Sequence, residues 1–244
     1  MTHSAITHQP ARIRVELQTS LRMGRFPVAL DGLLWHALFL KTGCPDAALE
    51  KLAGLVSSEQ GVFRASAMAF GIYNGSKHLI ATHNTTVGTM RSDSDLQPEQ
   101  FHPTGRRRTY PKLQIEGGPY RNRLNRYQTY YAPEVCWDAI ADAETVCDLL
   151  NFFVQGIGLE ANRGFGAVSR FRWEPMDTDS SWKDANQTLT RVLPEPLARQ
   201  ILDKPINERD RTLAQTTPPY RNTAMEPCVA PPRIRQFKLT PPAH

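Results

Sequence analysis

Residues 156–171, which read GIGLEANRGFGAVSRF, place an arginine between two Gly-x-Gly pairs. Glycine has no Cβ, so a glycine-rich backbone can approach a phosphate or a ribose closely, and its N–H groups can donate to anionic oxygens. An arginine at the same place adds a planar, two-pronged partner for a phosphate. These residue types therefore suggest a site for a phosphate-bearing ligand, and its candidate residues are Gly156, Gly158, Arg163, Gly164 and Gly166.

Two other interpretations of this glycine loop (156–166) compete with that one. The stretch GIGLEA fits a loose Gly-x-Gly-x-x-Ala dinucleotide fingerprint, but that fingerprint follows a strand and opens a helix, whereas here a helix precedes and a strand follows. A P-loop is excluded because no Gly-Lys-Ser/Thr follows, so we expect no cofactor. The structural alternative, in which Gly156 ends a helix and the other glycines serve tight turns, stays open.

A second candidate lies in residues 105–131, GRRRTYPKLQIEGGPYRNRLNRYQTYY, where seven basic residues face one acid, Glu116. Guanidinium groups pair with phosphates and aromatic rings stack on bases, a mixture typical of RNA contact. The alternative is a solvated basic loop with tyrosines packed on the core, but unpartnered charges would repel one another. The predicted RNA-binding residues are Arg106, Arg107, Arg108, Lys112, Arg121, Arg123, Arg126 and Tyr127, with Arg22 and Arg25 after the first strand.

Catalytic groups are harder to find. Metal-independent RNA cleavage needs a general base near a ribose 2′-OH and a cation for the phosphate. His36 lies in a helix that is apolar almost all round, so we expect it to be buried, and His78 and His83 point to opposite faces of a strand. His102 stands beside the arginine run without an evident partner. We assign no catalytic residue, and His102 and His36 are the candidates if the protein is an endoribonuclease.

A metal site is not expected either. No pair of nearby carboxylates suggests a metal nuclease, and none of the four cysteines stands at zinc-ligand spacing from another cysteine or a histidine. Cys136 and Cys147 have apolar neighbours and are expected to be small core residues.

The elements that would position these residues alternate between strands and helices. Residues 13–19 alternate apolar and polar side chains as a half-buried strand does. Asp31 is expected to cap the first helix and Gly43 to end it. The other expected helices span 46–56 and 142–155, and the other expected strands span 61–73, 77–84, 121–133 and 167–175.

The expected strands and helices follow the β-α-β-β-α-β order of an α+β, ferredoxin-like (RRM-like) domain, with an insertion at about 91–131. We expect that domain to span residues 1–175. Residues 176–244 form a C-terminal extension, which is helical near 195–203 and then proline-rich, basic and extended.

Composition narrows the functional class. The 244 residues carry a net charge of +5 with a pI near 9.1, a modest excess that suits a polyanionic partner. No apolar run is long enough to cross a membrane, and no secretion signal precedes the first strand, so we expect a cytoplasmic protein with no membrane partner.

The spacing of the glycine loop, with Arg163 in its five-residue gap, resembles the glycine-rich loop of RAMP proteins, the ferredoxin-like RNA-binding subunits of CRISPR effector complexes. The loop also falls between the last helix and the last strand, where that family has it. The stretch PVALDGLLWHALFLKTG is similar to the opening of the subunit that caps the 5′ handle of the crRNA, most closely to its type IV version. The resemblance covers about residues 12–175.

This resemblance implies a β-hairpin thumb within the insertion, which would clamp the crRNA handle. It implies a non-catalytic RNA-binding subunit of an antiviral CRISPR ribonucleoprotein, which caps the crRNA and anchors the backbone and large subunits. Target DNA near the PAM is a further implied partner. The alternative that some relatives suggest is a metal-independent endoribonuclease that processes precursor crRNA.

Overall fold

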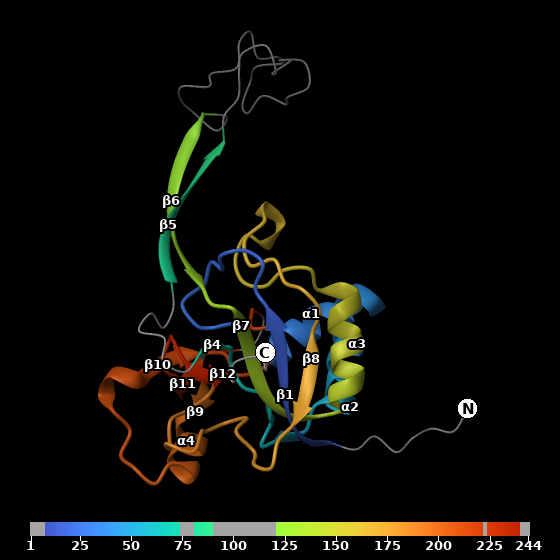
Figure 1. The fold of residues 1–244 in the computed structure, drawn as a ribbon. Coiled ribbons are helices and arrows are strands. Elements are labelled where there is room, and N and C mark those ends of the chain that lie inside the picture. The colour runs from blue at the N-terminus through green and yellow to red at the C-terminus, as the bar shows by residue number, and fades with distance from the viewer. Residues whose placement is uncertain (1–7, 74–80, 90–120, 222–223, 240–244) are drawn as a thin grey trace, which may run out of the picture. The chain divides into compact units, whose positions relative to one another are not determined.

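The computed structural model of the chain describes residues 8–73, 81–89, 121–221 and 224–239. Its contacts divide the chain into a main unit, residues 1–81 with 130–244, and a second unit, residues 82–129. The main unit is a mixed α+β fold around a five-stranded sheet with the order β12-β4-β7-β1-β8 (Figure 1). These strands are β1 (Gln9–Glu16), β4 (Ala69–Tyr73), β7 (Glu134–Ala141), β8 (Arg172–Pro175) and β12 (Gln236–Leu239).

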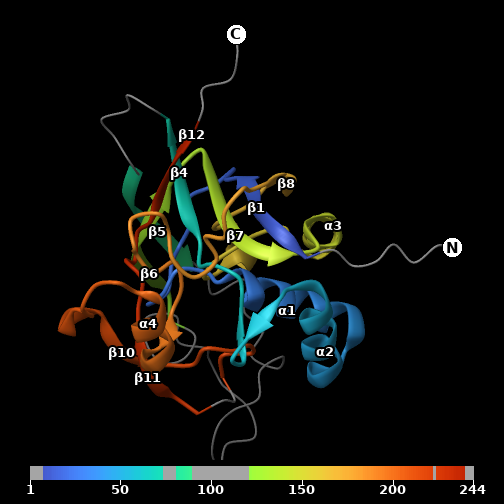
Figure 2. The same ribbon diagram turned by 90° about the horizontal axis from the view of Figure 1, so that it is seen from below.

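Helices connect strands that are not neighbours in this sheet. All adjacent strands are antiparallel except β12 and β4, which are parallel. α1 (Leu30–Thr42) and α2 (Pro45–Leu55) lie between β1 and β4 in the chain, and α3 (Ala143–Phe153) lies between β7 and β8. The three helices share one apolar core with alternate residues of β1 and β7, such as Ile13 and Trp137. Figure 2 shows the three helices beside these strands. One face of the sheet is therefore covered by helices.

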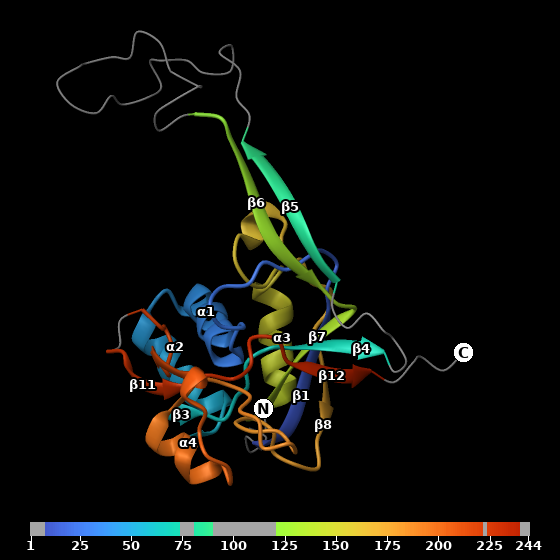
Figure 3. The ribbon, with the colours of Figure 1, turned by 90° about the vertical axis from the view of Figure 1, so that its left-hand side faces the viewer.

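The C-terminal extension has a second, smaller sheet of the order β10-β11-β9. It comprises β9 (Leu193–Pro194), β10 (Arg211–Ala214) and β11 (Glu226–Val229), with the short helix α4 (Glu195–Ile201), which confirms the helix expected there. A second apolar cluster, which includes Trp182, joins this sheet to Val62 of the β2 (Ser58–Glu59) and β3 (Val62–Phe63) pair. The extension then returns to the main sheet, where β12 runs beside β4 (Figure 3).

The second unit contains most of a two-stranded sheet of β5 (Ala81–Thr89) and β6 (Arg123–Tyr131). In chain order these strands lie between β4 and β7, in the part of the chain where the resemblance implies a thumb. Residues 90–120, which connect them, lie outside the described residues.

The central strand β7 has no counterpart among the predicted strands. Its sequence, EVCWDAIA, is buried at almost every position, so the side chains on both faces are covered and the apolar-polar alternation is lost. Glu134 and Asp138 also interrupt the apolar run. A strand buried on both faces with two charged residues carries no periodic signal.

Three further expectations are wrong. Ala29, rather than Asp31, is the N-cap of α1, and Asp31 is buried in its first turn. His36 is exposed, because it lies about 200° around the helix from the buried Leu34. Residues 61–73 form two short strands, β3 and β4, instead of one.

Candidate nucleic-acid interface

The glycine loop connects α3 to β8 and closes on itself. α3 ends at Phe153 with Val154 as its C-cap, so the expectation that Gly156 ends this helix is wrong. Gly156 instead forms a bridge with Ala167. The next residue continues the closure, because the N–H of Ile157 donates to the carbonyl of Gly166 at 2.9 Å. The tip between these ends contains a short 3-10 helix, Ala161–Arg163.

Two of the four glycines let the loop pack on the protein's own backbone. Gly158 has φ +85°, and a Cβ there would lie 2.5 Å from the carbonyl oxygen of Arg22. Gly166 has φ +60°, and a Cβ there would overlap the carbonyl oxygen of Ile157. Leu159 N–H donates to the Arg22 carbonyl at 2.8 Å, so the loop lies directly on the segment that follows β1. The structural alternative accounts for these two glycines.

Gly164 is different. It has φ +88°, and no atom lies within 4 Å of where its Cβ would be. Its carbonyl accepts a hydrogen bond from the Thr19 hydroxyl at 2.7 Å, which holds the loop tip to the segment after β1. The N–H of Gly164 donates to the Ala161 carbonyl at 3.0 Å, but the side on which a Cβ would stand is open. A ligand could approach this part of the loop, and Arg163 precedes it with a half-exposed side chain.

Arg22 and Arg163 converge on one carboxylate. The Nη1 atom of Arg22 lies 2.6 Å from Oε1 of Glu160, and Nη1 of Arg163 lies 3.6 Å from Oε2 of the same residue. Two guanidinium groups share one acid, so the cluster keeps a net positive charge. Because the shared acid limits where the arginines can lie, part of the entropy of ordering them is already lost before a phosphate binds.

Arg25 has other partners than this pair. Its Nη2 donates to the Thr212 hydroxyl at 2.8 Å, and its guanidinium carbon is 5.1 Å from the centre of the Phe26 ring. Arg25 is exposed. The two predicted arginines after β1 therefore have different surroundings. Arg22 joins Arg163 at Glu160, and Arg25 contacts the C-terminal extension at Thr212.

The ribbon of β5 and β6 carries the described part of the basic, aromatic segment. Arg121, Arg123 and Arg126 are exposed, and Tyr127 is half-buried. Because strand side chains alternate between faces, Arg123 and Arg126 point to opposite faces of the ribbon. The predicted contacts Arg106, Arg107, Arg108 and Lys112 lie outside the described residues.

The sheet face opposite the helices is rich in charge, but its charges pair with each other. Arg12 Nε lies 2.7 Å from Asp138 Oδ1, and Arg14 Nη2 lies 2.5 Å from Glu134 Oε2. Burial works to lower the pKa of Arg12, but the hydrogen bond and charge of Asp138 outweigh it, so that pKa is raised. Arg172 also pairs with Glu134. A face with this internal pairing has little charge left for phosphates.

The histidines do not form a catalytic group in the described part of the chain. His36 and His83 are exposed, on α1 and β5, while His78 and His102 lie outside the described residues. The positions one turn away from His36 on either side hold only apolar residues or glycine. Within the described ranges, no group of three or more histidine, cysteine, aspartate or glutamate residues could hold a metal ion. No described helix is long and apolar enough to cross a membrane.

The structure also gathers arginines that the sequence did not single out. Arg209, Arg211 and Arg233 of the extension line a small cavity together with Arg25. Only the basic, proline-rich composition of the tail could have pointed to them, because Arg25, the pair Arg209 and Arg211, and Arg233 come from three distant parts of the chain. Their arrangement depends on the fold of the extension.

Comparison with known proteins provides the family. The family model described as CRISPR type IV associated protein Csf3 matches residues 9–229, which is most of the chain and includes both the glycine loop and the C-terminal extension. No curated protein matches the chain. The resemblance to a type IV RAMP-like subunit, drawn from the glycine loop and the first helix, is thus confirmed. The chain belongs to the Csf3 family of CRISPR type IV associated proteins.

Proposed function

We propose that this protein is a non-catalytic RNA-binding subunit, which caps the 5′ handle of a crRNA in a type IV CRISPR ribonucleoprotein. It would end the row of backbone subunits, anchor the backbone and large subunits, and lie near the PAM side of the target DNA. Membership of a type IV CRISPR family supports a role as a subunit of such a complex.

The strand order supports a ferredoxin-like topology with one added edge strand. Without β12, the strands β1, β4, β7 and β8 are numbers one to four in the domain and lie in the order 4-1-3-2. All three of these contacts are antiparallel, and each crossover passes over one intervening strand. This is the arrangement of two split βαβ units. The glycine loop then lies in the last crossover, between α3 and β8.

One observation carries the choice of RNA. Arg22 and Arg163 come from different ends of the domain and meet at Glu160, beside the open backbone of Gly164. Two guanidinium groups beside an unobstructed backbone suit a phosphate and its ribose. Because much of the charge on the sheet face opposite the helices is paired, we place the handle at the glycine loop.

Handle binding measured across a salt series tests this proposal. For a labelled handle RNA, the logarithm of the association constant should fall with the logarithm of salt concentration by about 0.7 per phosphate neutralised. Arg163→Ala should weaken binding and reduce that slope by about 0.7. The matched control is Lys51→Ala, which removes one exposed charge from α2 and should leave binding unchanged. A flat salt response of the wild type, alone and with its partner subunits, would overturn the proposal.

The alternative, an endoribonuclease that processes precursor crRNA, has one observation in its favour. His36 is exposed, so its imidazole is open to a substrate. It lacks a cation within one turn of α1 to stabilise a phosphate in the transition state. Incubation with repeat RNA in EDTA should therefore give no specific cleavage. Cleavage that is lost in His36→Ala or His102→Ala would replace the proposed function with this one.

A further inference from the structure

Two cavities lie side by side where the C-terminal extension meets the segment after β1. The larger has a volume of about 540 Å³ and the smaller about 230 Å³. Both are lined by Arg25, Phe26, Pro27 and Pro231, so they share a wall. The larger cavity falls within the size of ordinary small-ligand pockets.

The larger cavity is apolar in character. Leu159, Leu213 and Met225 line it and are exposed to solvent, at 45 %, 58 % and 68 %. Exposed apolar side chains around one hollow are the pattern expected of a binding site. Phe26 adds an aromatic ring to the wall shared with the smaller cavity.

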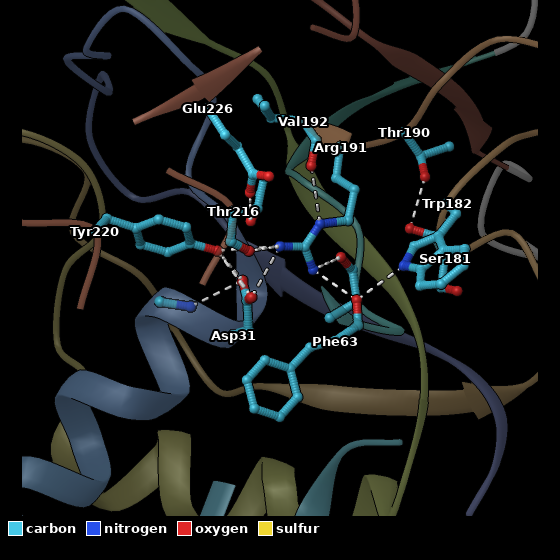
Figure 4. A network of polar contacts seen from close by, with 12 residues as sticks. Asp31, Phe63, Ser181, Trp182, Thr190, Arg191, Val192, Thr216, Tyr220 and Glu226 are labelled. Atoms are coloured by element: carbon cyan, nitrogen blue, oxygen red, sulfur yellow. Dashed lines mark hydrogen bonds and ion pairs between the residues drawn. The ribbon is translucent and has the colours of Figure 1, made fainter. Parts of the chain in front are cut away.

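Two polar side chains in the lining of this cavity, Arg191 and Tyr220, are already hydrogen-bonded. Arg191 donates to Asp31, to Tyr220 and to backbone carbonyls, as Figure 4 shows. The Tyr220 hydroxyl in turn donates to Asp31 at 2.7 Å. Burial raises the pKa of Tyr220, so the phenol remains neutral. The cavity therefore needs no charged ligand at these groups, and its exposed apolar side chains suit a largely apolar one.

The smaller cavity has the opposite character. Four arginines line it, and among the described residues of its lining Asp210 is the one acid. Arg211 is paired with Glu195 and Glu208. Arg209 and Arg233 are exposed. The positive charge of this hollow suits a phosphate.

We propose that these paired cavities form a nucleotide subsite on the C-terminal extension, with an unstacked base in the apolar cavity and a phosphate among the arginines. The ligand is one nucleotide of a single strand, from RNA or from DNA. A base stacks on Phe26 while Arg25 and Arg233 approach its phosphate from the other cavity. This inference rests on the proposed function and deepens it, because the subsite would extend the path of the strand beyond the glycine loop.

Continuity with the glycine loop supports this occupant. Leu159 lines the larger cavity, and the next residue, Glu160, holds Arg22 and Arg163. A strand whose phosphate lies at that arginine pair can therefore place a neighbouring base in the cavity. An acidic peptide would satisfy the arginines equally, but the division into one apolar and one basic hollow favours a nucleotide.

Fluorescence titration with five-nucleotide RNA and DNA strands tests the subsite, with 2-aminopurine as the central base. The wild type should quench the probe on stacking, and the RNA and DNA arms identify the source of the strand. Met225→Trp, which fills the exposed mouth of the apolar cavity, should abolish the quenching and weaken binding by about tenfold. Arg209→Ala and Arg233→Ala should each reduce the salt slope by about 0.7.

The outcomes separate this inference from the proposed function. The subsite is overturned if handle RNA binds tightly and its affinity and quenching are unchanged in Met225→Trp and in the Arg209→Ala/Arg233→Ala double variant. That result would leave the proposed function standing. Quenching of the short strands without preference for the handle supports the subsite and contradicts the function. Absence of wild-type quenching, or binding of an acidic peptide that Met225→Trp blocks, overturns the subsite. Lys51→Ala is the control for binding. The melting temperatures of all variants are compared, so that a loss of binding is not confused with a loss of fold.

Discussion

Arg191 and Asp31 form an ion pair that is almost completely removed from solvent. Arg191 Nη2 lies 3.0 Å from Asp31 Oδ2, and the two side chains are 2 % and 0 % exposed. Arg191 also donates to the carbonyls of Phe63 and Thr216. A single guanidinium therefore joins the first turn of α1, strand β3 and the C-terminal extension.

Removing one partner of this pair should destabilise the protein strongly. Asp31→Asn or Arg191→Met leaves a buried charge without its counter-charge, which typically costs about 3–5 kcal/mol of unfolding free energy. The measurement is urea unfolding followed by circular dichroism. Lys51→Ala on exposed α2 is the control and should change that free energy by no more than about 0.5 kcal/mol. A loss below about 1 kcal/mol in both pair variants would contradict this account.

Tyr220 should make stability depend on alkaline pH. Burial first, and then the charge of Asp31, raise its pKa well above 10.0 in the folded state. The folded state holds the phenolic proton more tightly than the unfolded chain does, so this stabilisation is complete below pH 10 and is lost as pH rises through the folded-state pKa. Unfolding at several pH values above about 10 should show a smaller decline in Tyr220→Phe than in the wild type. Equal declines would exclude this role for Tyr220.

The cysteines should differ sharply in reactivity. Cys44 is exposed, whereas Cys136, Cys147 and Cys228 are buried. Burial raises the pKa of Cys147 to about 12 and that of Cys228 to about 11, so little reactive thiolate forms at neutral pH. Iodoacetamide should therefore modify Cys44 alone in the native protein and all four thiols in urea, as read by mass spectrometry. Rapid native modification of Cys147 would show that the core around α3 opens readily.

Substitution of two glycines in the loop, Gly158 and Gly164, should reduce the stability of the protein by different amounts. Gly158→Ala introduces a Cβ 2.5 Å from the Arg22 carbonyl, so it must displace the segment that holds Arg22. Gly164→Ala meets no atom within 4 Å and costs only the strain of a left-handed backbone, about 1–2 kcal/mol. Urea unfolding should show the larger loss for Gly158→Ala.

Gly164→Ala also tests whether an RNA strand approaches the loop at Gly164. We expect Gly164→Ala to weaken handle binding while its circular dichroism spectrum stays that of the wild type. Unchanged affinity in Gly164→Ala would mean that this loop supports the interface without touching the RNA.

Local patterns predicted the elements that bury only one face. The amphipathic pattern of 142–155 corresponds to α3, and Gly43 ends α1 in the left-handed conformation as expected. The same reasoning failed for β7, because a strand covered on both faces does not alternate. It failed for His36 as well, since the composition of a helix does not specify which side meets the core.

The sequence by itself determined the family, through the spacing of the glycine loop and the opening of the first helix, and the α+β class, through the alternation of helical and strand periods. Tertiary structure alone decided what each glycine serves, because a Cβ clash at Gly158 depends on the carbonyl of a distant residue, Arg22. It also decided which arginines meet. Arg22 and Arg163 share Glu160, and Arg25 lines one cavity with Arg209 and Arg233. These residues meet only through the fold, because they lie in segments that are distant in the sequence.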